Sequence, residues 1–275
     1  MTIAIAAVTT PDDYIVTVSD RMISYGDVTL AEDNATMKAQ GISKHWGVMF
    51  SATDARIFQP IVRNTILRMN DLPAKISLAV AKQQVTEAYQ ETFDAEFTSC
   101  FLTRLGIRSV GEFRKDGFAQ LGPDVFMDLY RELSKFDLGI QLLCYGHDER
   151  DVPHLFEVEN PGHAVSHDLL RYAVIGSGYW MASASLRRKH LSGDLEATIY
   201  RLLEAKFSAE TATGVGKSTS VITLNSNGAL GMMTSGDIDR IKNVWERALK
   251  SPEPEDAIGL IGKSNAVTAI AGAGR

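Results

Sequence analysis

The second residue of the chain is the first candidate for chemistry. Thr2 follows the initiator Met1, so loss of that methionine would leave one residue carrying both a hydroxyl and a free α-amine. A threonine hydroxyl is a poor nucleophile unless a base lies within hydrogen-bond reach, and an α-amine on the same residue is such a base. The reference pKa of an α-amine, roughly 7.7–8.0, is already near neutrality. Thr2 is therefore a candidate nucleophile for attack on an amide carbonyl.

Four further features have types and spacings that could serve this chemistry. Asp20 ends the second predicted strand, and Lys38 lies nine positions before Gly47. Gly176-Ser177-Gly178 opens a predicted helix, and Glu210-Thr211-Ala212-Thr213-Gly214 precedes the last predicted hairpin. Each has an ordinary explanation by itself, such as a strand-end ion pair, a solvated lysine or a helix cap. Their joint order and spacing carry the functional interpretation.

Taken together, these features resemble the proteasome β-subunit family and its bacterial relative HslV. The resemblance covers about residues 2–235 and is strongest from Leu142 to Gly228, where strand, acidic hairpin, Ile-Gly-Ser-Gly, helix, Gly-rich loop and strand recur in the family's order. It implies an α+β fold, the four-layer αββα sandwich of the N-terminal-nucleophile hydrolases.

The resemblance also implies roles for individual residues. Thr2 would be the nucleophile, Asp20 would orient the lysine, and Lys38 would lower the pKa of the α-amine because a nearby cation disfavours its charged form. Lys38 would also stabilise the alkoxide. Ser177 corresponds to a serine near the amine. The other implied positions are Glu210 and Thr213 in the Gly-rich loop, the Ala52 N–H as oxyanion donor, and Phe50 in the specificity pocket.

Several positions depart from the family's pattern. The oxyanion position is Ala52 rather than Gly, the acidic residue of the late loop is Glu210 rather than Asp, and its hydroxyl comes from Thr213 rather than Ser. The segment at about 97–121 reads as an insertion into the helical layer. Exposure of Thr2 would depend on an aminopeptidase, which the small side chain at position 2 should permit.

The predicted elements agree with a layered α+β domain. β-branched and aromatic runs predict strands at 2–9, 14–19, 36–42, 47–51, 139–145, 154–158 and 172–175, and a hairpin at 220–233 turning on Asn225-Ser226-Asn227-Gly228. Apolar periodicity predicts helices between 55 and 136, then at 180–188, 194–205 and 238–249. We expect a single domain over 1–250, followed by a C-terminal tail over 251–275.

Composition argues against other classes of protein. The 34 acidic and 28 basic residues give a formal charge of −6 without long like-charge runs, which is unlike a nucleic-acid-binding protein. No apolar stretch is long enough for a membrane span, and no basic region precedes the apolar start, so a cytoplasmic protein is expected. Gly214-Val215-Gly216-Lys217-Ser218 lacks the first glycine of a phosphate loop, and Gly176-Ser177-Gly178 lacks a third small residue at Met181. The six histidines show no metal-ligand spacing, so we expect neither metal nor cofactor.

The leading functional interpretation is a threonine-type amide hydrolase, a proteasome-like peptidase acting on peptides or proteins. Two alternatives remain open: a non-catalytic ring or scaffold subunit, and a hydrolase of small amides on the same fold. The resemblance further implies a homo-oligomeric ring and a possible ATPase unfoldase as partner.

Overall fold

The computed structural model describes residues 2–11, 13–25, 28–32, 38–188 and 193–249, and it describes 23–25 and 28–32 through the backbone alone. Met1, the start of the predicted strand 36–42 and the predicted tail 251–275 lie outside the described residues. The chain divides into two compact units, Met1–Ser235 and Gly236–Arg275. Helix α7 (Ser235–Leu249) accounts for the described part of the second unit. The predicted single domain over 1–250 stays a prediction.

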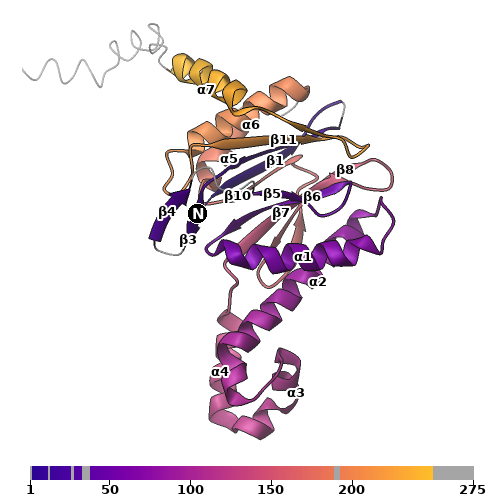
Figure 1. The fold of residues 1–275 in the computed structure, drawn as a ribbon, viewed down its shortest axis with the longest axis vertical. Coiled ribbons are helices and arrows are strands. Elements are labelled where there is room, and N and C mark those ends of the chain that lie inside the picture. Colours follow the sequence, from indigo (N-terminus) through magenta and orange to yellow (C-terminus); the bar gives the residue numbers. More distant parts are fainter. Residues whose placement is uncertain (1, 12, 26–27, 33–37, 189–192, 250–275) are drawn as a thin grey trace, which may run out of the picture. The chain divides into compact units, whose positions relative to one another are not determined.

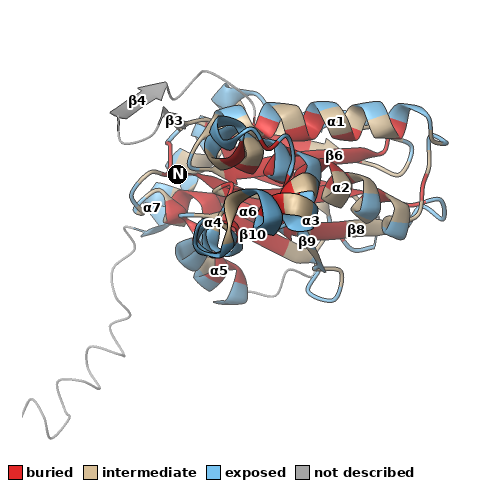
Figure 2. Ribbon diagram, turned by 90° about the horizontal axis from the view of Figure 1, so that it is seen from below, coloured by how far each residue is buried: buried red, intermediate tan, exposed pale blue. Residues whose placement is uncertain are grey.

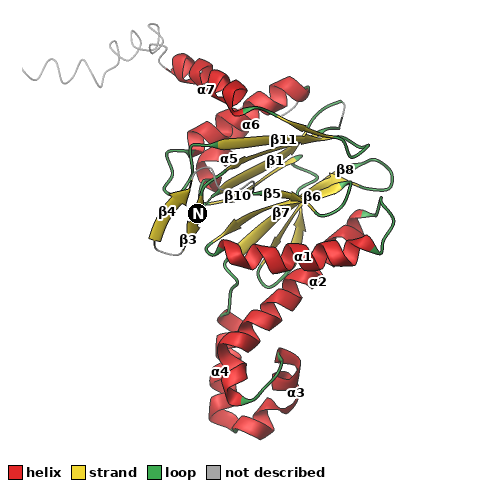
Figure 3. Ribbon diagram, viewed as in Figure 1, coloured by secondary structure: helices red, strands yellow, loops and turns green. Residues whose placement is uncertain are grey.

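Two five-stranded antiparallel sheets form the centre of the first unit (Figure 3). The first sheet has the order β10-β1-β2-β11-β12 and the second has the order β5-β6-β7-β8-β9. The strands of the first sheet are β1 (Ile3–Val8), β2 (Ile15–Asp20), β10 (Tyr172–Gly176), β11 (Thr219–Leu224) and β12 (Leu230–Met232). Those of the second sheet are β5 (Ala39–Gly41), β6 (Trp46–Ala52), β7 (Ile140–His147), β8 (Pro153–Glu159) and β9 (His163–Ser166). A separate two-stranded ribbon pairs β3 (Ile23–Tyr25) with β4 (Val28–Glu32).

The sheets pack face to face because their strands carry apolar side chains on the inner face as well as on the face that the helices cover. Ala4, Ala6 and Val8 of β1 lie in one buried cluster with Met49 of β6 and Leu143 of β7. Neighbouring residues of a strand point to opposite faces, so the remaining side chains of β1 face away from the second sheet. All six residues of β1 are buried, and Figure 2 shows the strands as the buried centre of this unit.

Helices cover the outer face of each sheet. A second apolar cluster joins Trp46, Val48 and Phe50 of β6 to Ile61 of α1 and Val85 of α2. On the other sheet, α6 contacts β1 and β2, and α5 contacts β10 (Figure 1). The helices are α1 (Phe58–Asn70), α2 (Leu78–Phe97), α5 (Tyr179–Arg188) and α6 (Leu195–Ala209). The predicted α+β four-layer αββα sandwich is confirmed.

The segment predicted as an insertion belongs to a helical arm. After α2 the chain makes a π-helical turn (Thr98–Leu102) and a 3-10 turn (Thr103–Leu105), then forms α3 (Val110–Leu121) and α4 (Pro123–Lys135). Figure 1 shows α3 and α4 away from both sheets. Aromatic rings hold the arm together: Phe97 lies 4.8 Å from Phe101 and Phe113 lies 4.9 Å from Phe126, measured between centroids.

Most strands and helices predicted from the sequence are present, with shifts of a few residues at their ends. The predicted hairpin is confirmed: Gly228, at φ 78°, closes the turn by donating its N–H to the Asn225 carbonyl at 3.0 Å. The sequence analysis missed β3, β4 and β9. Among the described residues, no helix has the length and apolar character needed to cross a membrane.

Candidate active site

The sandwich brings the start of β1 beside the end of β2. These strands pair antiparallel with Ala4 opposite Ser19, and the same register places Ile3 opposite Asp20. The Ile3 N–H donates to Asp20 Oδ1 at 3.0 Å. Thr2, immediately before β1, and Asp20, the last residue of β2, therefore meet at one end of the first sheet.

Thr2, Asp20 and Lys38 converge in a buried cluster. The Thr2 hydroxyl donates to Asp20 Oδ1 at 2.5 Å, and Lys38 Nζ lies 2.8 Å from the same oxygen. Lys38 Nζ also donates to Thr2 Oγ1. The exposed fractions are 2% for Thr2, 0% for Asp20 and 2% for Lys38. Long-range packing thus joins one residue from each of three segments, and Lys38 comes from the segment that enters the second sheet at β5.

A loop residue fixes the other oxygen of the carboxylate. The Gly216 N–H donates to Asp20 Oδ2 at 3.0 Å. Asp20 therefore accepts from Thr2, Ile3 and Lys38 on Oδ1 and from Gly216 on Oδ2. With donors on both oxygens, the carboxylate is held in one orientation, and so are the groups that it contacts.

The Gly176-Ser177-Gly178 segment positions the backbone of Thr2. The Thr2 carbonyl oxygen accepts hydrogen bonds from the Ser177 hydroxyl at 3.3 Å and from the Gly178 N–H at 3.4 Å. Gly176 has φ +98°, and a Cβ there would lie 2.3 Å from the Thr2 carbonyl oxygen. Only glycine fits this approach, because the backbone conformation and the space both exclude a side chain.

The backbone N–H of Ala52 is turned toward the edge of β6 along which β5 lies. The Thr53 N–H donates to the Gly139 carbonyl oxygen at 2.9 Å, which extends the ladder between β6 and β7 by one hydrogen-bonded pair. Ala52 and Ile140 form the next pair of this ladder. Hydrogen-bonded and non-hydrogen-bonded pairs alternate in an antiparallel ladder. The Ala52 N–H therefore points away from β7, and Lys38 immediately precedes β5 on the opposite edge.

The remaining predicted site residues have other surroundings. Phe50 is 5% exposed and packs with the helical layer, where its ring centroid lies 4.0 Å from that of Phe58. Glu210 is the C-cap of α6, and its carboxylate accepts from Lys206 Nζ at 2.6 Å. Thr213 is exposed in the loop after α6. The structure thus groups Thr2, Asp20, Lys38 and Ser177 by direct contacts, whereas Glu210 pairs with Lys206 on α6.

Sequence reasoning missed Gly216, which contacts Asp20, and the buried Lys206. Gly216 was considered only as part of a phosphate loop, although its N–H binds Asp20. Lys206, with 0% exposure, was not considered. The only signal for it was its i,i+4 spacing from Glu210, which is also the spacing of ordinary exposed pairs on a helix.

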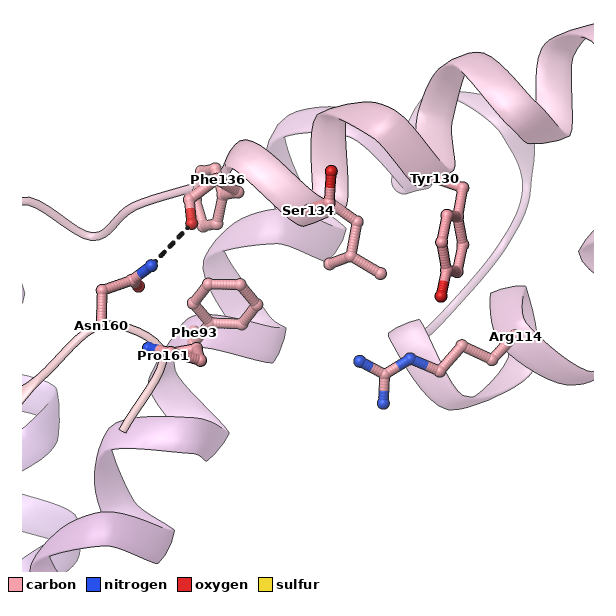
Figure 4. Close-up of a pocket in the computed structure, with 8 residues that line it drawn as sticks. Phe93, Arg114, Tyr130, Ser134, Phe136, Asn160 and Pro161 are labelled. Atoms are coloured by element: carbon pink, nitrogen blue, oxygen red, sulfur yellow. Dashed lines mark hydrogen bonds between the residues drawn. The ribbon is translucent and has the colours of Figure 1, made fainter. Parts of the chain in front are cut away.

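A cavity of about 250 Å³ lies elsewhere, between the arm and the loop after β8. Phe93, Tyr130 and Phe136 supply its aromatic side chains. Arg114 and Asn160 lie on opposite sides of the cavity (Figure 4). None of the residues that line this cavity is a predicted site residue. The described residues also include no group of three or more His, Cys, Asp and Glu side chains suited to a metal ion.

Comparison with known proteins supports the fold. No protein-family model matches the sequence, and no curated protein matches it. Solved structures do match, among them the Gly-1 mutant of Anbu from Hyphomicrobium sp. strain MC1. That structure superposes with a TM-score of 0.64 over 92% of this chain and 99% of its own, at 13% identity. The chain therefore has the proteasome-like sandwich fold that is found in the N-terminal-nucleophile hydrolases.

Proposed function

We propose that the chain is a threonine-type N-terminal-nucleophile amide hydrolase in which Thr2 attacks once Met1 has been removed. One observation carries the proposal: the Thr2 hydroxyl contacts both the Asp20 carboxylate and the Lys38 ammonium in a buried cluster. The contacts place the candidate nucleophile beside a cation that can lower the pKa of the Thr2 α-amine, the base that such a hydroxyl needs, and beside a carboxylate that orients both groups.

The reaction follows from these contacts. Thr2 Oγ1 attacks the amide carbon while its proton passes to the α-amine, and the Lys38 ammonium lowers the pKa of that amine by disfavouring a second positive charge. The oxyanion accepts a hydrogen bond from the Ala52 N–H. Such a donor stabilises the transition state by roughly 2.7–4 kcal/mol in a water-poor site. Collapse breaks the C–N bond, the leaving amine takes the proton, and an ester on Thr2 remains. Water, deprotonated by the α-amine, then hydrolyses the ester and regenerates the hydroxyl.

We propose peptides as the substrate class, with small amides as the variant to be separated by assay. One observation favours instead a non-catalytic subunit: Thr2 and Lys38 are each only 2% exposed.

We also propose that the chain forms a ring of copies. The support is the apolar surface of α5, where Trp180 is 78% and Met181 50% exposed, since such surface is usually covered by a partner. The mass of the assembly in solution tests this part, and a monomer at all concentrations contradicts it.

The test of the hydrolase begins with the intact mass of protein from the native host. We expect a species that lacks Met1, and a fully retained methionine overturns the proposal. Fluorogenic peptides and a panel of small amides then define the substrate. Thr2→Ala should abolish turnover and Thr2→Ser should retain part of it, because serine keeps a hydroxyl beside the amine. Equal activity of wild type and Thr2→Ala supports the scaffold.

A further inference from the structure

Lys206 lies on the buried face of α6 although lysine is among the side chains least often fully buried. Its exposed fraction is 0%, and Leu202, Leu203 and Phe207 around it on the helix are buried as well. Burying an ammonium group is costly unless charged and polar partners compensate it. Lys206 Nζ donates to Glu210 Oε1 at 2.6 Å and to the Lys217 carbonyl oxygen at 2.8 Å.

The second of these partners connects Lys206 to the Thr2 cluster. The Lys217 carbonyl belongs to the residue directly after Gly216, whose N–H donates to Asp20 Oδ2 at 3.0 Å. One residue further on, the Ser218 carbonyl accepts the Arg21 N–H at 3.2 Å. The loop before β11 is therefore held between the ammonium of α6 on one side and the end of β2 on the other.

We propose that Lys206 is a positioning residue of the Thr2 site, with Glu210 as its counter-ion. By holding the 216–217 segment, Lys206 keeps the Gly216 N–H on Asp20 Oδ2. This fixes the carboxylate so that Oδ1 is presented to Thr2 and Lys38. Glu210 then contributes through Lys206. Only the kinetic part of this inference rests on the proposed function.

A purely structural role makes a different prediction. Apolar side chains of similar volume often replace a buried ion pair without loss of stability, so packing alone does not require a charge here. A positioning role instead requires the ammonium for orientation. Small displacements of a reacting group can cost about 100-fold in rate. We therefore expect Lys206→Met to lower kcat about 10- to 100-fold at unchanged KM.

The kinetic experiment is a double-mutant cycle of Lys206→Met, Glu210→Gln and the double variant, assayed on fluorogenic peptide. Lys115→Met, an exposed lysine of α3, is the matched control and should keep wild-type kcat. If Glu210 acts through Lys206, the double variant is no slower than Lys206→Met, since residues in one network do not add. Additive losses show that Glu210 acts independently of Lys206 and contradict its role as counter-ion, and unchanged kcat in Lys206→Met refutes the positioning role.

A second measurement does not depend on catalysis. Amide hydrogen exchange at Gly216, followed by NMR, should lose protection in Lys206→Met but not in Lys115→Met. If the wild type turns over no substrate, the hydrolase proposal fails while the exchange result still decides whether Lys206 holds the loop. Wild-type exchange at Gly216 in a folded Lys206→Met variant overturns the inference. Should Lys206→Met fail to fold, the double variant, in which both charges are removed, carries the same exchange test.

Discussion

Replacing Lys38 with methionine should destabilise the protein as well as inactivate it. The substitution keeps most of the side-chain volume but removes the cation 2.8 Å from Asp20 Oδ1, at a carboxylate with 0% exposure. Breaking a buried pair by removing one partner costs about 3–5 kcal/mol, because a buried charge is left uncompensated. Asp20 retains its donors from Thr2, Ile3 and Gly216. We therefore expect the lower end, about 3 kcal/mol of the free energy of unfolding.

Urea denaturation measures this loss. With a slope of roughly 2–3 kcal/mol/M, the midpoint should fall by about 1 M or more. The double variant Lys38→Met/Asp20→Asn removes both charges and should regain part of the stability, while both variants remain inactive. A single variant as stable as wild type refutes the reasoning, since it would mean that Asp20 and Lys38 do not form a buried ion pair.

Two further predictions concern single positions. Gly176→Ala should cost about 2–4 kcal/mol and abolish turnover, because its Cβ meets the Thr2 carbonyl; Gly106→Ala, at φ +79° with open space around it, should cost only about 1–2 kcal/mol in the same denaturation assay. An equal cost for both contradicts the steric argument. Burial by itself would lower the pKa of His154, but hydrogen bonds to Asp168 and Asp148 outweigh it and raise that pKa above 6.5. The stabilisation is then complete below about pH 6.5 and is lost as pH rises through the folded value, so the difference in unfolding free energy between wild type and His154→Asn should shrink from pH 6 to pH 9; a constant difference argues against a charged His154.

The sheets were the most predictable part of the fold because their strands are long and rich in β-branched residues. β1, from Ile3 to Val8, is apolar at every position since it lies between a helical layer and the second sheet, and a continuous apolar run marks such a strand. Short strands give too few residues for a pattern. β9, at His163–Ser166, has mostly exposed side chains, so its position on the edge of the sheet follows from pairing with β8 alone.

The grouping of candidate residues was predictable where it depends on residue type and the order along the chain, as for Thr2, Asp20 and Lys38. It was not predictable where a role depends on which side of a helix or loop is buried. A lysine and a glutamate four positions apart usually indicate a solvated helix face. Only the contact of α6 with the loop before β11 reveals that Lys206 is buried. The Gly216 contact is likewise made by a backbone N–H, which carries no signature in the sequence.

Asp20 couples the stability of the sandwich to the geometry of Thr2, the proposed nucleophile. Its two oxygens accept donors from the start of β1, from the segment before β5 and from the loop before β11, so one carboxylate fixes segments of both sheets. Any variant that disturbs Asp20 will therefore alter folding and turnover together. The positions that can separate these effects are those that act on Asp20 through one donor only. Lys206 acts on Asp20 through the Gly216 N–H. The double variant Lys206→Met/Glu210→Gln removes both charges of the ion pair and leaves neither uncompensated, so it should reduce turnover more than it reduces the free energy of unfolding.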